Sequence, residues 1–498
     1  MKDKKHSEGG FRADASTPVR GGARSIDADG IAAPDVIGDG VLPLPAWKAE
    51  TKALVALGLP FGLTQLVQFS VNTIDVLMIG RLGAAELAAS SLGLVFFYFT
   101  FLVGFGPAMA VSPMVSQALG ADADNTRDAR RSVRMGLWAI AFYFPAMAVF
   151  YLFAADIARA LGQPEELARL AGPYVLALAP GWPFMLGVIL LRNFLAAIDR
   201  TRAPLLFVIV TTVINAFLNY LLIYGSWGFP RLELVGAGIA SSLAHMIGFF
   251  ALVAYIQWDK RGRQFDLFSK FLQPDWERLK EVMRLGWPIS VTTGFEALLF
   301  NASVFIVGRI GVAEVAAYQI ALNVAALAFM TPLGFSIAGA TRVGLAAGAR
   351  DNDGVIRAAV VTIGVCVAAI MAFAIPIALN PGFIAGLYLE TADPENRTVI
   401  QLVATFLPVA AAFMFFDAVQ VAANQCLRGL KDVDAPMVLT GISYWIIGFS
   451  VAYWLGLHTS LGAIGVWWGL LCSLVTASIL LSARLAWVIR RERRLQNS

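Results

Sequence analysis

Residues 74–86, IDVLMIGRLGAAE, return 228 positions later as residues 302–314, ASVFIVGRIGVAE. The same shift, without a gap, places further glycines and a proline of the first half on their counterparts in the second. These pairs are Gly58 and Gly286, Pro60 and Pro288, Gly106 and Gly334, and Gly120 and Gly348. The chain therefore contains two copies of one largely apolar unit, a pattern typical of duplicated membrane bundles.

Composition indicates that the solvent of this chain is lipid. Of its 498 residues 58% are hydrophobic and only 14% are charged, too few to cover the surface of a soluble globule. About 20 apolar residues cross a hydrocarbon core of roughly 30 Å. Twelve stretches are long enough: 53–80, 88–116, 132–155, 168–197, 203–225, 234–257, 281–308, 314–343, 356–380, 399–426, 435–457 and 461–488.

Six spans per copy is an even number, so both copies enter the bilayer in the same direction. We therefore predict an all-α polytopic membrane protein of 12 transmembrane helices, in two six-helix bundles related by a pseudo-twofold axis along the membrane normal. The predicted divisions are a disordered cytosolic tail, an N-lobe, a cytosolic linker, a C-lobe and a basic cytosolic tail. Their bounds are 1–50, 51–257, 258–280, 281–490 and 491–498, respectively.

Basic residues predict the orientation, because the translocation machinery retains lysine and arginine on the cytosolic side. The loops around Arg127 and Arg261, with the end of the chain around Arg491, hold most of them. We thus expect both termini inside and a location in the cytoplasmic, or inner, membrane. This topology accounts for the net charge of +4, which gives no support for nucleic-acid binding.

The sequence offers few residues for catalysis, redox chemistry or metal binding. The three cysteines, Cys366, Cys426 and Cys472, lie within predicted spans without metal or redox spacing. Beyond the N-terminal tail the only histidines are His245 and His458, with no partner motif for catalysis. We therefore expect that the protein is not an enzyme, that it needs no cofactor and that it is a monomer.

Three carboxylates lie inside the predicted spans, where an ionised acid is costly unless it is compensated. Asp75 is close to the outer end of the first span, whereas Glu296 and Asp417 lie near the midplane of the seventh and tenth. We expect no lysine or arginine at matching depth, because Arg192 and Arg342 are near cytosolic span ends and can extend to water. Locking helices together is the alternative role.

Other polar and flexible residues fall into three groups. Asn215 and Asn219 share one helical face at the depth of Asp75, and with Asn72 they predict an N-lobe polar site. Gln68, Gln319, Asn323, Phe295, Phe329 and Met330 are candidates for the wall of a substrate cavity, although lipid-facing positions remain an alternative for the last three. Pro60 and Pro288 predict either hinges or static bends.

Several runs resemble the multidrug and toxic compound extrusion (MATE) transporters. They are Ile74–Gly80, Gly286–Ile289 leading to Glu296, Asp417–Val421 with Leu427–Asp432, Asn215–Asn219, and Tyr318–Ala321. The resemblance covers about residues 50–490. The acidic pair in the second lobe is more similar to the NorM-type branch than to the DinF-type branch.

This resemblance implies a secondary antiporter in which inward H⁺ or Na⁺ drives export of an organic, often cationic, compound. It implies that Glu296 and Asp417 bind the coupling cation, including a possible Na⁺, and that Asp75 with its asparagines binds ion or substrate. The choice between H⁺ and Na⁺ stays open. A lipid-linked-precursor flippase is the alternative, but it would need a cationic cavity for phosphate groups.

Overall fold

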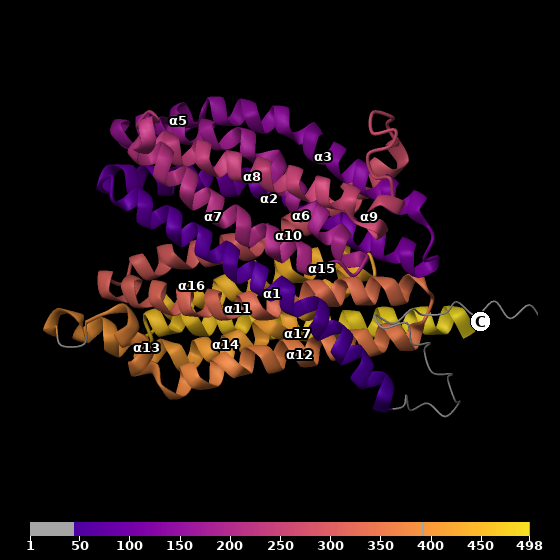
Figure 1. Ribbon diagram of the computed structural model, residues 1–498. Coiled ribbons are helices and arrows are strands. Elements are labelled where there is room, and N and C mark those ends of the chain that lie inside the picture. The colour runs from indigo at the N-terminus through magenta and orange to yellow at the C-terminus, as the bar shows by residue number, and fades with distance from the viewer. Residues whose placement is uncertain (1–43, 391–392, 498) are drawn as a thin grey trace, which may run out of the picture. The chain divides into compact units, whose positions relative to one another are not determined.

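The computed structural model describes residues 44–390 and 393–497, and within them twelve helical spans are long and apolar enough to cross a membrane (Figure 1). The twelve-span, two-lobe prediction is confirmed. The N-lobe contains α1 (Leu44–Gly80), α2 (Ala84–Ala121), α3 (Thr126–Leu152), α4 (Ala154–Ala160), α5 (Glu165–Leu178), α6 (Trp182–Ala197), α7 (Arg202–Tyr224) and α8 (Glu233–Trp258). Short α4 joins α3 to α5, and α5 and α6 together form the fourth span, Glu165–Ala197.

The C-lobe repeats this order after a connector that contains α9 (Lys260–Gln264). It consists of α10 (Trp276–Gly308), α11 (Val312–Gly348), α12 (Asn352–Leu379), α13 (Pro381–Tyr388), α14 (Arg397–Gly429), α15 (Asp434–Gly441), η4 (Ile442–Phe449), α16 (Ser450–Leu457) and α17 (Ala463–Asn497). Segments α15, η4 and α16 form the eleventh span, and η4 is a π-helix in its middle.

Glycines of the repeat allow the lobes to pack against each other, and their contacts follow the twofold relationship. A Cβ atom on Gly120 of α2 would lie 2.0 Å from the carbonyl oxygen of Leu345 on α11. A Cβ on the matching Gly348 of α11 would lie 2.1 Å from the carbonyl oxygen of Gln117 on α2. The two crossing points exchange under the shift of 228 residues, so only glycine fits at either helix crossing.

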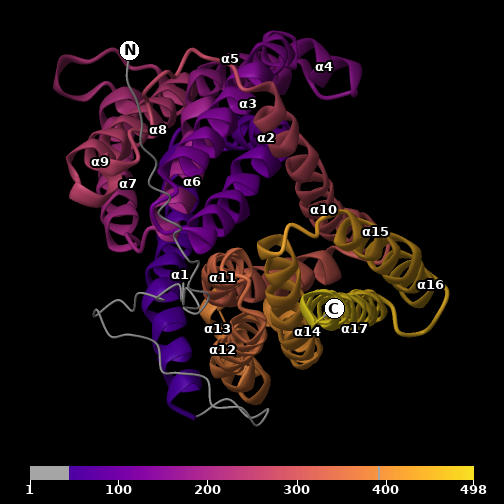
Figure 2. The same cartoon turned by 90° about the vertical axis from the view of Figure 1, so that its right-hand side faces the viewer.

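Helix α1 belongs to both lobes. Near its start, Leu54, Leu57 and Phe61 form a buried cluster with Ile337 of α11 and Val361 of α12. Near its end, the Tyr224 hydroxyl of α7 donates a hydrogen bond to the Met78 carbonyl oxygen at 2.9 Å. Figures 1 and 2 show α1 (indigo) passing from the side of α12 to the side of α7. The first half of α1 therefore packs on the C-lobe, and the second half packs on the N-lobe.

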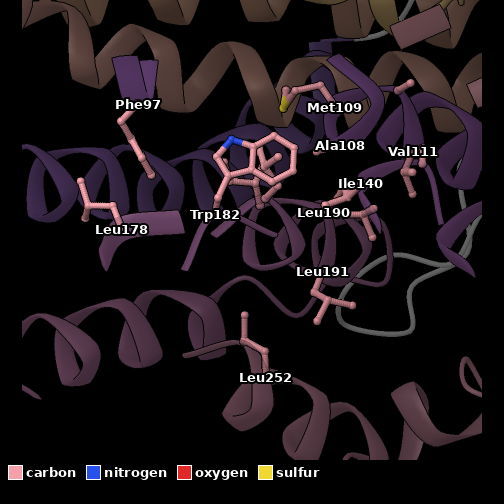
Figure 3. Close-up of a cluster of buried hydrophobic side chains, with 14 of the residues drawn as sticks. Phe97, Ala108, Met109, Val111, Ile140, Leu178, Trp182, Leu190, Leu191 and Leu252 are labelled. Atoms are coloured by element: carbon pink, nitrogen blue, oxygen red, sulfur yellow. The ribbon is translucent and has the colours of Figure 1, made fainter. Parts of the chain in front are cut away.

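Each lobe has its own packed core. Trp182 of α6 is fully buried among side chains that include Phe97, Met109 and Leu190 (Figure 3). Trp467 of α17 occupies an equally buried position in the C-lobe. Because acyl chains solvate apolar side chains nearly as well as protein does, these rings stabilise the fold through close packing rather than removal from water.

Three predicted boundaries were wrong. Helix α1 begins at Leu44, and Glu50 is held by Arg342 of α11 at 2.6 Å, so residues 44–50 belong to the bundle; the predicted tail before them lies outside the described residues. The connector ends at Asp275, whose side chain caps α10, so residues 276–280 are helical. Helix α17 continues to Asn497, so the basic C-terminal segment extends a helix instead of forming a separate tail.

Candidate functional site

A polar stripe on α14 is the central feature of the C-lobe. Asp417, Gln420, Asn424 and Arg428 recur every three or four residues, so they share one face of the helix. All four are at least nine-tenths buried. The Oδ1 atoms of Asp417 and Asn424 and the Oε1 atom of Gln420 have no hydrogen-bond partner among the described residues. Three buried oxygens on one face can accept a proton donor or a cation.

Glu296 of α10 faces this stripe and interacts electrostatically with both Asp417 and Arg428. The Gln420 amide donates a hydrogen bond to the hydroxyl of Tyr444, which lies in the π-helix η4. A π-helical segment within a longer helix often occurs at functional sites. Two neighbouring carboxyl groups repel each other when both are ionised, so the pair favours sharing a proton or a small cation.

The expectation that Arg192 extends to water was wrong, and Arg428 is a further arginine that acts on the acids. Arg428 is near Glu296, although no ion pair within 4.0 Å joins the two. Arg192 does not extend to water: it is 4% exposed, donates a hydrogen bond to Gln68 Oε1 at 3.1 Å, and lies over the ring of Phe61. Contacts with Gln68 and Phe61 of α1 help to enclose this guanidinium, an effect that span position alone does not reveal.

A second polar cluster lies in the N-lobe. Asn219 of α7 donates a hydrogen bond to Asp75 Oδ1 at 2.6 Å and a second to Asn215 Oδ1 at 3.3 Å. The Ser241 hydroxyl of α8 forms a hydrogen bond with the Asp75 carboxyl group, and it accepts one from the Asn215 amide at 3.3 Å. Three helices thus meet around one carboxyl group. Asn72 points elsewhere and donates to the hydroxyl of Tyr98 at 3.4 Å.

The predicted wall residues are dispersed. Phe295 is half-buried beside Gly441, and Phe329 and Met330 are half-buried on α11. Gln319 and Asn323 are exposed, and Asn323 accepts a hydrogen bond from the Tyr388 hydroxyl at 3.0 Å. Within the described part of the chain, no hydrogen bond or ion pair connects these five residues to either acidic cluster.

Sequence reasoning missed Gln420, Asn424, Arg428, Tyr444 and Ser241. The first three were visible in principle, because they continue from Asp417 with helical spacing. Tyr444 and Ser241 had no such signal, since each lies on a helix that meets the acids only after folding.

Two like-oriented six-helix lobes with acidic clusters enclosed by apolar helices define a polytopic membrane transporter with an internal repeat. A family model described as MatE matches residues 60–221 and again residues 288–454, so its second match begins 228 residues after the first. The chain belongs to the multidrug and toxic compound extrusion (MATE) family.

Curated relatives resemble nearly the whole chain. "Probable multidrug resistance protein NorM" of Rhizobium meliloti (strain 1021) is 41% identical over 452 residues, which cover 90% of this chain and 95% of that protein. The protein of the same name from Agrobacterium fabrum (strain C58 / ATCC 33970) is 37% identical, covering 90% and 96%.

Solved structures share the fold at lower identity. A eukaryotic MATE transporter superimposes with a TM-score of 0.78 at 19% identity, covering 90% of this chain and 99% of that one. A multidrug resistance MATE family transporter of the MOP superfamily in an outward-facing conformation gives a TM-score of 0.80 at 21% identity, covering 89% and 96%.

Proposed function

We propose that this protein is a secondary active antiporter that exports organic, multidrug-type compounds, many of them cationic, in exchange for inward H⁺ or Na⁺. It works as a monomer without a cofactor in the cytoplasmic membrane, with both termini in the cytosol. The names of the NorM relatives support the substrate class, and the excess of arginine at the end of the bundle where α1 begins supports the orientation.

The observation that carries the proposal is the pairing of Glu296 with Asp417 beside unpartnered buried oxygens. A buried carboxyl pair is most stable when it holds one positive charge, which a proton, Na⁺ or an organic ammonium can supply. Since these cations compete for one negative site, loading of one releases another. Glu296 and Asp417 then form the coupling-ion site, and Na⁺ would use their oxygens together with those of Gln420 and Asn424.

The contacts between the lobes support a mechanism of alternating access. Their close contacts use the halves of α1, α2, α10 and α11 on the side where α1 begins, including Gly62 against Gly334 and Gly106 against Gly286. We assign this side to the cytosol. Separating the same surfaces while the outer halves approach would move the acidic clusters from one aqueous side to the other.

Transport in proteoliposomes tests the proposal. An imposed pH gradient and an imposed Na⁺ gradient are applied separately, with fluorescent organic cations and neutral compounds as substrates. We expect one gradient to drive uptake by wild type, and Glu296→Gln or Asp417→Asn to reduce the rate at least tenfold. Glu277→Gln, an exposed acid on the same helix α10, is the matched control and should transport normally. Full transport by both charge-neutral variants would refute the assignment.

The flippase alternative is tested in the same vesicles. A flippase for lipid-linked precursors handles phosphate groups, which acidic clusters repel. We expect a fluorescent lipid with a diphosphate headgroup to stay in its original leaflet under either gradient. Gradient-driven flipping of that lipid, with no movement of organic cations, would replace the antiporter proposal.

A further inference from the structure

A groove lined by aromatic side chains lies on the N-lobe, away from both acidic clusters. It has a volume of about 410 Å³ and lies between α3, α6, α8 and the connector that follows α9. Its lining includes Ala141, Phe184, Phe249, Phe250, Phe268 and Phe271. A groove of this size is within the range of small-ligand sites, and its lining suits a flexible hydrocarbon chain.

The aromatic groove continues into a more polar one. The second groove, of about 490 Å³, shares Gln257 and Phe268 with the first and is also lined by Arg263, Asp266 and Ser269. One elongated molecule could therefore place an apolar part among the phenylalanines and a polar part beside Arg263.

Charge in the polar groove favours an anion. Arg263 is exposed and forms no ion pair within the part of the chain that the structure describes. Asp266 is on the same groove, but Arg130 lies 3.7 Å from it and offsets its charge. Lys260 and Lys270 on the same connector are also exposed. The local field is positive.

The connector that closes both grooves is held in place by the N-lobe. The Trp138 indole of α3 donates a hydrogen bond to the Phe271 carbonyl oxygen at 2.9 Å, and Arg134 donates to the Lys270 carbonyl oxygen at 3.0 Å. Phe265 and Leu267 are each 3% exposed. Because the backbone and the apolar side chains of the connector are anchored, the aromatic groove is formed before any ligand binds.

We propose that these two grooves bind one anionic phospholipid, with an acyl chain among the phenylalanines and the phosphate at Arg263. Such a lipid is supplied by the bilayer itself, and basic groups beside a membrane-facing apolar surface recognise it. The grooves lie at the same end of the bundle as the start of α1, where the cytosolic leaflet would meet the protein. The bound lipid fastens the connector between the lobes to the N-lobe.

Native mass spectrometry of the full chain tests this, with delipidated protein titrated with dioleoylphosphatidylglycerol or with dioleoylphosphatidylcholine. We expect one molecule of phosphatidylglycerol to bind tightly, and phosphatidylcholine to bind with lower affinity. Arg263→Gln should weaken it about fivefold, the order expected for one basic group near a phosphate. Ala141→Trp, which fills the aromatic groove without touching charge, should remove it. Arg202→Gln, an exposed arginine at the same end of the bundle, is the control and should have no effect.

Each contrary result overturns the proposal. Equal binding of both lipids would show that the headgroup is not recognised. Undiminished phosphatidylglycerol binding in Ala141→Trp would show that the acyl chain lies elsewhere. An equal loss of phosphatidylglycerol affinity in Arg202→Gln and Arg263→Gln would show that general surface charge, not a site at Arg263, attracts the lipid. Circular dichroism on each variant verifies that the helices remain.

Discussion

Asn219 on α7 and Asp75 on α1 are joined by a hydrogen bond of 2.6 Å, and this bond ties the second half of α1 to the N-lobe. Asp75→Asn keeps an oxygen that can accept this bond but removes the charge, whereas Asn219→Leu removes the donor. We expect Asp75→Asn to retain thermal stability and lose transport, and Asn219→Leu to lose about 1–3 kcal/mol because the carboxyl group loses one of its two hydrogen-bond partners.

Thermal unfolding in detergent and transport in proteoliposomes measure the two effects separately. If Asp75→Asn transports at the wild-type rate, the N-lobe cluster serves only to hold helices together.

Arg428 interacts electrostatically with Glu296, so it would compete with the coupling cation if Glu296 holds that cation as proposed. Arg428→Gln removes this charge, so we expect Glu296 to hold H⁺ or Na⁺ about tenfold more tightly, the order expected for a unit charge roughly 12 Å away at an effective dielectric near 20. Isothermal titration with Na⁺ and the cation concentration that half-saturates transport report the change. Arg428→Lys should restore the wild-type values, and unchanged cation affinity in Arg428→Gln would rule out the competition.

The glycine contacts between α2 and α11 predict sensitivity to a single methyl group. Gly120→Ala and Gly348→Ala each place a Cβ about 2 Å from a backbone carbonyl oxygen of the other lobe. We expect the helices to separate there, with a loss of about 1–3 kcal/mol and a longer spin-label distance across this end. Gly364→Ala on α12 is the control, because its Cβ would meet nothing within 4 Å. Equal behaviour of all three variants would contradict the assigned contact.

The two repeat prolines carry matching hydrogen bonds. Thr64 donates to the Pro60 carbonyl oxygen and Thr292 to the Pro288 carbonyl oxygen, both at 2.7 Å. If these positions are hinges, Pro60→Ala and Pro288→Ala restore a helical hydrogen bond, raise thermal stability and slow turnover. Pro381→Ala, at the first turn of α13, should change neither. Wild-type turnover in both repeat variants would leave static curvature as their role.

Asp275 predicts a dependence of stability on pH. Arg131 of α3 lies 2.5 Å from it, and this hydrogen bond holds the pKa of the Asp275 carboxyl below its usual value of 3.8. A lowered folded-state pKa stabilises the protein fully above the usual value, and the gain is lost as pH falls through the lowered one. The unfolding temperature of Asp275→Asn should therefore be lower than that of wild type at pH 6–8.

The difference between Asp275→Asn and wild type should shrink below about pH 4, as the carboxyl protonates. Asp124→Asn, an exposed acid in the α2–α3 turn, serves as the control without such a difference. A constant difference down to pH 3 would show that Asp275 acts through packing or capping alone.

Much of the fold was readable from local sequence, and so were the acids. A segment in lipid must satisfy its backbone hydrogen bonds internally, so each span is a continuous apolar run whose length alone identifies it. Carboxylates in such runs are conspicuous because they are expensive there. The shift of 228 residues identified the repeat, because both copies kept the glycines on which the lobes pack.

Only the tertiary structure decided which of these groups meet. Arg428 is at the end of its span in the sequence, yet the packing of α10 against α15 and η4 within the C-lobe brings Glu296 near it. Tyr444 accepts a hydrogen bond from Gln420 and lies in a π-helix, which the hydrophobic periodicity of the sequence did not predict. The connector was predicted from its length and charge, but its docking on Trp138 depends on a neighbouring helix. Helix length is set by neighbours along the chain, whereas contacts between helices depend on side-chain shape across lobes that are distant in sequence.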